Sequence, residues 1–228
     1  FEMKYLILPI LLAYTCLSFA QKNPAALKII YLKSYNGKLI EDQDPIWVFA
    51  DDNKTVLSSK NIVEQKAVFP YEKSFIDRKT NHHIQTAQLS SSKEISTIDS
   101  LSIKKQTFEF LNETKTILGY KCKKAKTIVN SNTIEIWYTN DLKIKGSPMI
   151  LGQDLGLVLE VNRNNNFIIT ATKIEKLKEI PEKVANSKAK LNPIASPNDF
   201  VNTRDFMTNR DTEAQGYQTA QTGLANQL

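Results

Sequence analysis

The stretch that decides the fold runs from Ile117 to Val161 and reads ILGYKCKKAKTIVNSNTIEIWYTNDLKIKGSPMILGQDLGLVLEV. Within it, Lys121–Val129 and Thr133–Thr139 are rich in the β-branched and aromatic residues that favour strands. At its end, Leu157–Val161 is followed by an Asn-rich loop of five residues and a second apolar run, Phe167–Thr172. Two apolar runs on either side of such a loop predict a β-hairpin.

Alternation along this hairpin predicts which side chains are buried. Because successive strand residues point to opposite faces, Leu157, Leu159 and Val161 share one face. Val158 and Glu160 share the other face. We expect the Leu157 face to be buried. A similarly buried face is expected on the preceding strand for Ile134, Ile136 and Tyr138.

The same period of two dominates residues 27–177, which predicts one mainly β, predominantly antiparallel domain. We place this domain at residues 21–180. One segment, Ile174–Glu182, predicts a short helix that Pro181 would end. The other strand-like runs are Leu27–Ser34, Trp47–Ala50, Lys66–Arg78, His83–Leu89, Glu94–Leu101 and Thr107–Leu111.

The N-terminus has the three parts of a secretory signal peptide. Lys4 supplies the positive charge, residues 5–19 are apolar, and Ser18–Ala20 is a small-x-small cleavage site. The signal peptide would span residues 1–20, with residues 1–2 preceding the natural start. The apolar run is too short to span a membrane, which takes about 20 residues. We therefore expect export to the periplasm or the medium, with no transmembrane segment in the mature chain.

The C-terminal residues, 181–228, differ in composition from the β domain. They are rich in Asn, Thr, Gln, Ala and Ser and contain few periodic apolar residues. Such a segment buries too little apolar surface to offset the entropy of ordering. We expect a polar, largely irregular tail or linker, which could be the truncated entry to a further domain.

The reactive residues of the mature chain do not predict a catalytic site. Cys122 is its single cysteine, and a nucleophilic thiol would need a histidine partner. The only histidines, His82 and His83, are adjacent and would point to opposite faces of a strand. Sequence motifs for nucleotide, metal or hydrolase sites are absent. We expect no catalytic residue, no cofactor and no metal.

The charged residues give two weaker signals. The Asp residues at 42, 44, 51 and 52 fall in turns, where Asp bonds the local backbone, and they lack the Gly and Glu of a calcium loop. The chain has a net charge of +6, but only four of its 30 basic residues are arginine, which disfavours a nucleic-acid partner. The lysines at 121, 123, 124 and 126 are expected to lie on a solvated sheet edge.

Four strand aromatics are the candidate binding residues: Trp47, Tyr120, Trp137 and Tyr138. Aromatic side chains in strands serve either as core residues or, where exposed, as stacking platforms for sugars or peptides. Core packing is the favoured interpretation, and a binding platform is the alternative.

Three blocks of the chain resemble the GLPGLI family of exported Bacteroidetes β proteins. These blocks are Ile117–Ala125, Glu135–Thr139 with Gly146–Pro148, and Leu155–Glu160. The namesake hexapeptide would fall on Gln153–Val158, of which Gly156, Leu157 and, conservatively, Val158 match. The branch of the family that departs from this hexapeptide is similar to the bowl-like N-terminal domain of type II peptide-N-glycosidase F. This resemblance implies a curved sheet or half-barrel.

The resemblance also implies a function. In those enzymes the bowl-like domain precedes catalytic domains that remove N-glycans from glycoproteins, and none of the catalytic residues lies in it. The chain would then be an exported, non-catalytic accessory or binding module whose partners are a glycan, a glycoprotein or a following catalytic domain. The alternative is a stand-alone periplasmic carrier or envelope protein that holds an apolar ligand in a curved sheet.

Overall fold

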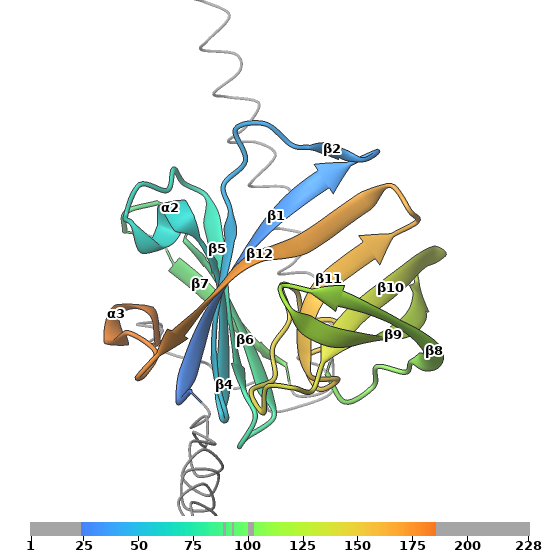
Figure 1. Ribbon diagram of the computed structural model, residues 1–228. Helices are drawn as coiled ribbons and strands as arrows, with labels where there is room; N and C mark the ends of the chain where they lie inside the picture. Colours follow the sequence, from blue (N-terminus) through green and yellow to red (C-terminus); the bar gives the residue numbers. More distant parts are fainter. Residues whose placement is uncertain (1–23, 89, 93, 100–102, 186–228) are drawn as a thin grey trace, which may run out of the picture.

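The computed structural model describes residues 24–88, 90–92, 94–99 and 103–185. These residues form one antiparallel sheet that curves strongly, with two short helices beside it (Figure 1). The predicted mainly β, antiparallel, curved architecture is therefore confirmed. The expected signal peptide and residues 186–228 of the expected tail lie outside the described residues.

The described part of the chain forms twelve strands and two short helices. The strands are β1 (Ala26–Tyr35), β2 (Lys38–Leu39), β3 (Ile46–Asp51), β4 (Lys54–Ser59), β5 (Tyr71–Asp77), β6 (His82–Gln88), β7 (Glu94–Asp99), β8 (Glu109–Ile117), β9 (Tyr120–Val129), β10 (Asn132–Thr139), β11 (Leu157–Arg163) and β12 (Phe167–Leu177), and the helices are α2 (Lys60–Val63) and α3 (Glu182–Ala185).

The first strand lies at the centre of the sheet. The strand order of the sheet is β7-β6-β5-β4-β3-β1-β12-β11-β10-β9-β8, with β2 paired to the end of β1. The chain meanders from β3 to β7, crosses to the opposite edge, and meanders back from β8 to β12, which pairs with β1. The two meanders thus meet on β1, and β7 and β8 are the edge strands of the described sheet.

Register shifts bend the sheet at three places. They lie between Ile30 and Tyr31 in β1, between Leu111 and Thr114 in β8, and between Trp137 and Tyr138 in β10. An extra residue in one strand increases the local twist and bends the strand. The result is a sheet curved around one large core.

That core, here the central cluster, contains residues from strands far apart in the sheet. β3 and β9 are separated by four other strands, yet both contribute side chains to it, so the sheet must curve around these residues. Two further clusters lie elsewhere, one against α3 and one under the β10–β11 loop. The buried members of the central cluster are Leu27, Ile29, Tyr31, Val48, Ala50, Cys122, Trp137, Leu142, Ile144, Leu157, Leu159, Ile169 and Ala171.

The burial prediction for the hairpin is confirmed, since Leu157, Leu159 and Val161 are all buried, but Val161 lies on the other face. Leu157 and Leu159 are fully buried in the central cluster. Val161, predicted on their face, instead packs with Val158 in the cluster under the β10–β11 loop. The reason is the bulge: Trp137 pairs with Glu160 and Tyr138 with Val158, so Leu159 is the extra residue and the alternation changes phase. The expected buried face of Ile134, Ile136 and Tyr138 is confirmed.

The long β10–β11 loop, residues 140–156, lies within the second meander and forms hydrogen bonds to residues of the first (Figure 1, yellow). The carbonyl of Lys145 accepts hydrogen bonds from Thr55 Oγ1 at 3.5 Å and from Arg78 Nη2 at 3.0 Å. Within the loop, fully buried Gln153 donates from Nε2 to the carbonyls of Ser147 and Met149. Gln153, one of the three residues that depart from the GLPGLI hexapeptide, therefore stabilises the loop.

Tyr31 fastens the central strand to the bulge in β11. Its side chain is fully buried, and its hydroxyl donates to the carbonyl of Val158 at 2.7 Å. Burial raises the pKa of Tyr31, so the hydroxyl keeps its proton and remains a donor at any ordinary pH.

Replacing Tyr31 by phenylalanine should lower the free energy of unfolding by about 1–3 kcal/mol, because the buried Val158 carbonyl loses its side-chain donor. Urea denaturation measures this loss. Tyr35→Phe, in the same strand but 52% exposed, is the control and should stay close to wild type. Equal stabilities for Tyr31→Phe and the parent chain would contradict a stabilising role for this hydrogen bond.

The predicted helix at Ile174–Glu182 is wrong over most of its length. β12 continues to Leu177, because Ile174 and Lys176 pair with Ile29 and Leu27 of the central strand. Within the predicted segment only Glu182 is helical, as the first residue of α3, which begins directly after Pro181. Proline is favoured at the start of a helix, so here it precedes the helix instead of ending it.

Three elements were not predicted from the sequence, and one strand was predicted too long. The unpredicted elements β2, β4 and α2 are short, and the predicted strand Lys66–Arg78 begins only at Tyr71. Ile180 and Val184 are buried against Phe49, Val56 and Phe75, so packing on the β domain reaches into the segment expected to be tail.

Candidate functional site

The four predicted aromatics do not form one platform. Trp137 and Tyr138, 8% and 6% exposed, belong to two different clusters on opposite faces of β10. Tyr120 is partly buried against the central cluster. Trp47, on β3, is partly buried, and the ammonium group of Lys28 lies 3.3 Å from its ring centroid. Whether any of them binds a ligand stays a prediction.

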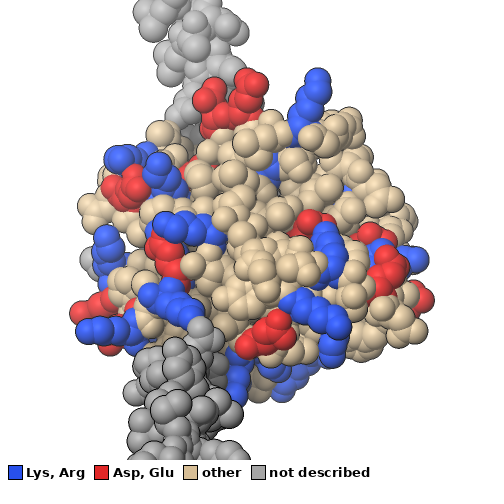
Figure 2. All heavy atoms as spheres, in the orientation of Figure 1, with Lys and Arg blue, Asp and Glu red and all other residues tan. Residues whose placement is uncertain are grey.

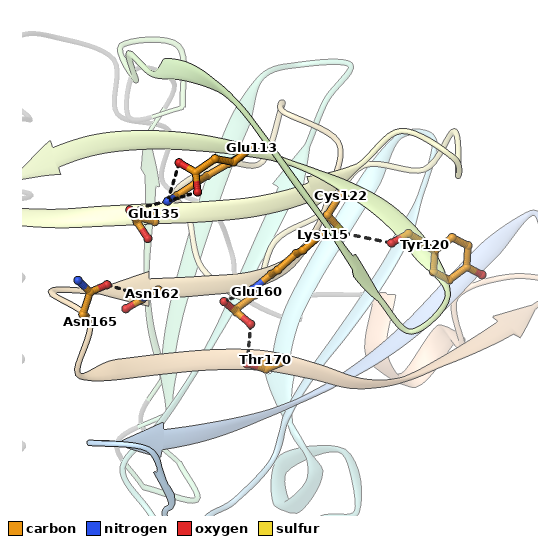
Figure 3. A network of polar contacts seen from close by, with 10 residues as sticks. Glu113, Lys115, Tyr120, Cys122, Glu135, Glu160, Asn162, Asn165 and Thr170 are labelled. Atoms are coloured by element: carbon orange, nitrogen blue, oxygen red, sulfur yellow. Dashed lines mark hydrogen bonds and ion pairs between the residues drawn. The ribbon is translucent and has the colours of Figure 1, made fainter.

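A network of paired charges joins side chains of β8 to β12 (Figure 3), and two of its lysines lie over the Trp137 ring. Lys124, opposite Trp137 on β9, forms ion pairs with Glu135 at 2.8 Å and Glu113 at 3.1 Å. Lys115 of β8 reaches Glu160 of β11 at 2.6 Å, and the oxygens of Glu160 also accept from the Thr170 hydroxyl at 3.4 Å.

The two lysines of this network also cover the indole ring. The ammonium groups of Lys115 and Lys124 lie 4.4 and 5.4 Å from the Trp137 ring centroid. The hydrogen bond to Glu135 is the main reason that the pKa of Lys124 is raised, so Lys124 stays charged. Each carboxylate is ion-paired with a lysine, so the arrangement does not present a free carboxylate pair for acid–base chemistry. The two lysines instead cover Trp137 at the border of the central cluster.

The lysine-rich segment is not a solvated edge as predicted. β9 pairs with β8 on one side and β10 on the other, so it is an interior strand. Lys124 is only 8% exposed, whereas Lys121 and Lys123 are exposed on the opposite face. On the face drawn in Figure 2, basic and acidic side chains are interspersed.

The nucleophile and base candidates lie in different halves of the sheet. Cys122 is fully buried on β9, and burial raises the pKa of its thiol, which keeps it in the unreactive protonated form. His82 and His83 lie on β6, in the other meander, with His83 buried and His82 partly exposed. The structure thus brings no histidine to Cys122.

The turn aspartates bond the backbone. Asp51 Oδ1 accepts from the amides of Asn53 and Lys54, each at 2.7 Å, and Asp44 Oδ1 accepts from the amide of Asn61 at 3.0 Å. In the described part of the chain, no three His, Cys, Asp or Glu side chains gather as metal ligands would. No helix among the described residues is long and apolar enough to cross a membrane.

A polar pocket of about 340 Å³ lies between α2, α3 and one face of β4–β7, and we call it the α2–α3 pocket. Its residues come from six elements and one loop and share no motif, so sequence alone does not identify them. Its size is within the range of small-ligand sites. Its lining residues are Ser58, Ile62, Val63, Gln65, Tyr71, Lys73, Gln88, Glu94, Lys183 and Val184.

Comparisons with known proteins agree with this architecture. A family model described as the N-terminal domain of N-glycanase (PNGase F-II) matches residues 29–196. Two solved structures of PNGF-II, in C2 and P21 crystal forms, are each 42% identical to the chain, with TM-scores of 0.69 and 0.70. They cover 75% and 74% of this chain, and the chain spans only 31% of each of them. Among curated proteins no relative matches the chain.

Proposed function

The chain belongs to the family of PNGase F-II N-terminal domains, and from this premise we propose that it is an exported, non-catalytic accessory module of a glycan-processing enzyme. The observation that carries the proposal is 42% identity to PNGF-II over three quarters of the chain, with the same fold. Because the chain spans 31% of PNGF-II, the remaining length of such an enzyme is available for catalytic domains.

The positions of the reactive side chains support the non-catalytic part of the proposal. Cys122 is buried in one meander, and the histidines lie in the other. Glu113 and Glu135 share an ion pair with Lys124, and Glu160 pairs with Lys115. In the proposed arrangement, N-glycan release is the work of a domain that follows this one, and the present domain contacts the glycoprotein.

The carrier alternative receives less support. A carrier for an apolar ligand needs space inside the curved sheet, and that region contains tightly packed side chains such as Leu142, Ile144 and Leu159. Membership of the wider GLPGLI family and export through the signal peptide stay predictions. N-terminal sequencing of the secreted protein would test export, with Gln21 as the expected first residue.

Residues 21–228, purified, should release no N-glycan from a denatured glycoprotein, yet should bind that glycoprotein more tightly than its deglycosylated form. Mass spectrometry of released glycans measures the first part, and biolayer interferometry measures the second. Glycan release that is abolished by replacing one of the chain's own Asp or Glu residues would overturn the non-catalytic assignment. Equal binding of the two glycoprotein forms would overturn the accessory glycan-directed role.

A further inference from the structure

We propose that the α2–α3 pocket is a binding site for an acidic sugar residue. The pocket is distinct from the four aromatics predicted from sequence and from the charge network around Trp137. The inferred ligand class rests on the proposed function, whereas the existence of the site is inferred from the geometry and chemistry of the residues that line it.

The floor of the pocket is one row of side chains across adjacent strands. Tyr71 of β5 pairs with Gln88 of β6, and Gln88 pairs in turn with Glu94 of β7. Lys73 shares the face of Tyr71 by alternation, and Ser58 comes from the neighbouring strand β4. A phenol, an amide, a carboxylate, an ammonium group and a hydroxyl thus line one concave surface.

The walls of the pocket are held in place without a ligand. α2 is capped at its start, because Ser59 Oγ accepts from the Ile62 amide at 3.3 Å and Asp44 accepts from the Asn61 amide. On the other side, Val184 of α3 is 7% exposed and packs in the cluster with Phe75. Both helices lie beside the β5–β7 part of the sheet (Figure 1). A preformed site loses less conformational entropy when a ligand binds.

Three charged groups of this pocket have no ion-pair partner within the described chain. Lys73 and Lys183 form no ion pair with any described carboxylate, and Glu94 forms none with any described cation. The ammonium group of Lys73 lies 5.9 Å from the Phe75 ring centroid, which leaves its charge unneutralised. The hydroxyl of Ser58 is buried beneath the pocket surface and makes no hydrogen bond to the described chain. The charged groups are therefore the ones available to a ligand.

The mixture of groups points to the ligand class. Two ammonium groups against one carboxylate give the pocket an excess positive charge, which attracts an anionic group. The amide of Gln65 and the carboxylate of Glu94 suit the donors and acceptors of sugar hydroxyls, whereas the Gln88 amide already donates to the Ser90 carbonyl at 2.7 Å. The Tyr71 ring stacks on that of Phe69, with centroids 5.5 Å apart, and extends the apolar surface at the rim, where Phe69 is 37% exposed. A sugar ring that carries a carboxylate matches all of these features.

The test compares N-acetylneuraminic acid, galactose and inorganic sulfate as probes of residues 21–228, by calorimetry and ligand-observed NMR. The acidic sugar should bind more tightly than either other probe, and less tightly as salt is added. The double variant Lys73→Met/Lys183→Met should weaken its binding at least about tenfold. Lys79→Met, which removes an exposed lysine at the β5–β6 turn, is the matched control and should bind like wild type.

Ser58→Ala provides a second, independent variant. Its Tm should be unchanged or higher, because the hydroxyl has no partner in the described part of the chain. Its affinity for the acidic sugar should stay close to wild type, because the Oγ is buried beneath the pocket surface. Unaltered affinity in the Lys73→Met/Lys183→Met variant would overturn the proposal, and so would sulfate binding as tight as that of the sugar. If none of the three probes bound while the preferential binding of the glycoprotein remained, the α2–α3 pocket would be refuted as a sugar site and the proposed function would stand.

Discussion

Replacing Leu159 by alanine should lower the free energy of unfolding by about 2–5 kcal/mol. The side chain is fully buried in the central cluster, at the point where β11 carries one more residue than β10. Its neighbours come from both meanders and from the β10–β11 loop. Because these elements are held by one another, we expect them to close only partly over the cavity that the shorter side chain leaves.

Guanidinium chloride denaturation, monitored by tryptophan fluorescence and by far-ultraviolet circular dichroism, measures this loss. Leu39→Ala is the matched control: the same change in a strand residue that is 59% exposed, expected within about 0.5 kcal/mol of wild type. A Leu159→Ala variant as stable as the Leu39→Ala control would mean that the hairpin's buried face is assigned to the wrong residues.

The architecture was predictable from the sequence because it depends on local patterns. The run Thr133–Thr139 and the hairpin after Leu157 alternate strictly enough to identify strands. The alternation fails where a non-local feature intervenes. Val161 lies on the opposite face from that predicted, because the bulge at Leu159, two residues earlier, shifts the phase of the alternation. Ile174–Leu177 is a strand because it pairs with β1, which lies more than 140 residues earlier in the chain.

The site was less predictable, for a related physical reason. Trp47 and Trp137 are conspicuous in the sequence, but their exposure depends on lysines from other strands, Lys28 in one case and Lys115 with Lys124 in the other. The α2–α3 pocket draws its polar groups from Ser58 to Lys183. Neither residue belongs to a recognisable motif, so only the folded sheet places them together.

A glycine-to-alanine change at residue 156 should destabilise the fold by about 2–5 kcal/mol. Gly156 has φ of +152°, a conformation that strains any residue with a Cβ. A Cβ there would lie 2.5 Å from Asn140 Oδ1 and 2.6 Å from the Thr139 carbonyl oxygen. The carbonyl belongs to the backbone at the end of β10, so it can move only by disturbing the β10–β11 pairing.

Gly119→Ala separates the two causes of this loss of stability, which are the backbone strain and the steric clash of the added Cβ. Gly119 also has a positive φ, +82°, but a Cβ there meets nothing within 4 Å. It should therefore show the backbone strain alone, about 1–2 kcal/mol. Thermal and urea denaturation of the two variants measure the difference. Because the amide of Gly146 donates to the Gly156 carbonyl, hydrogen exchange at Gly146 should also become faster in Gly156→Ala than in Gly119→Ala. Equal losses and equal exchange in the two variants would contradict close packing of Gly156 against β10 as the reason for glycine at this position.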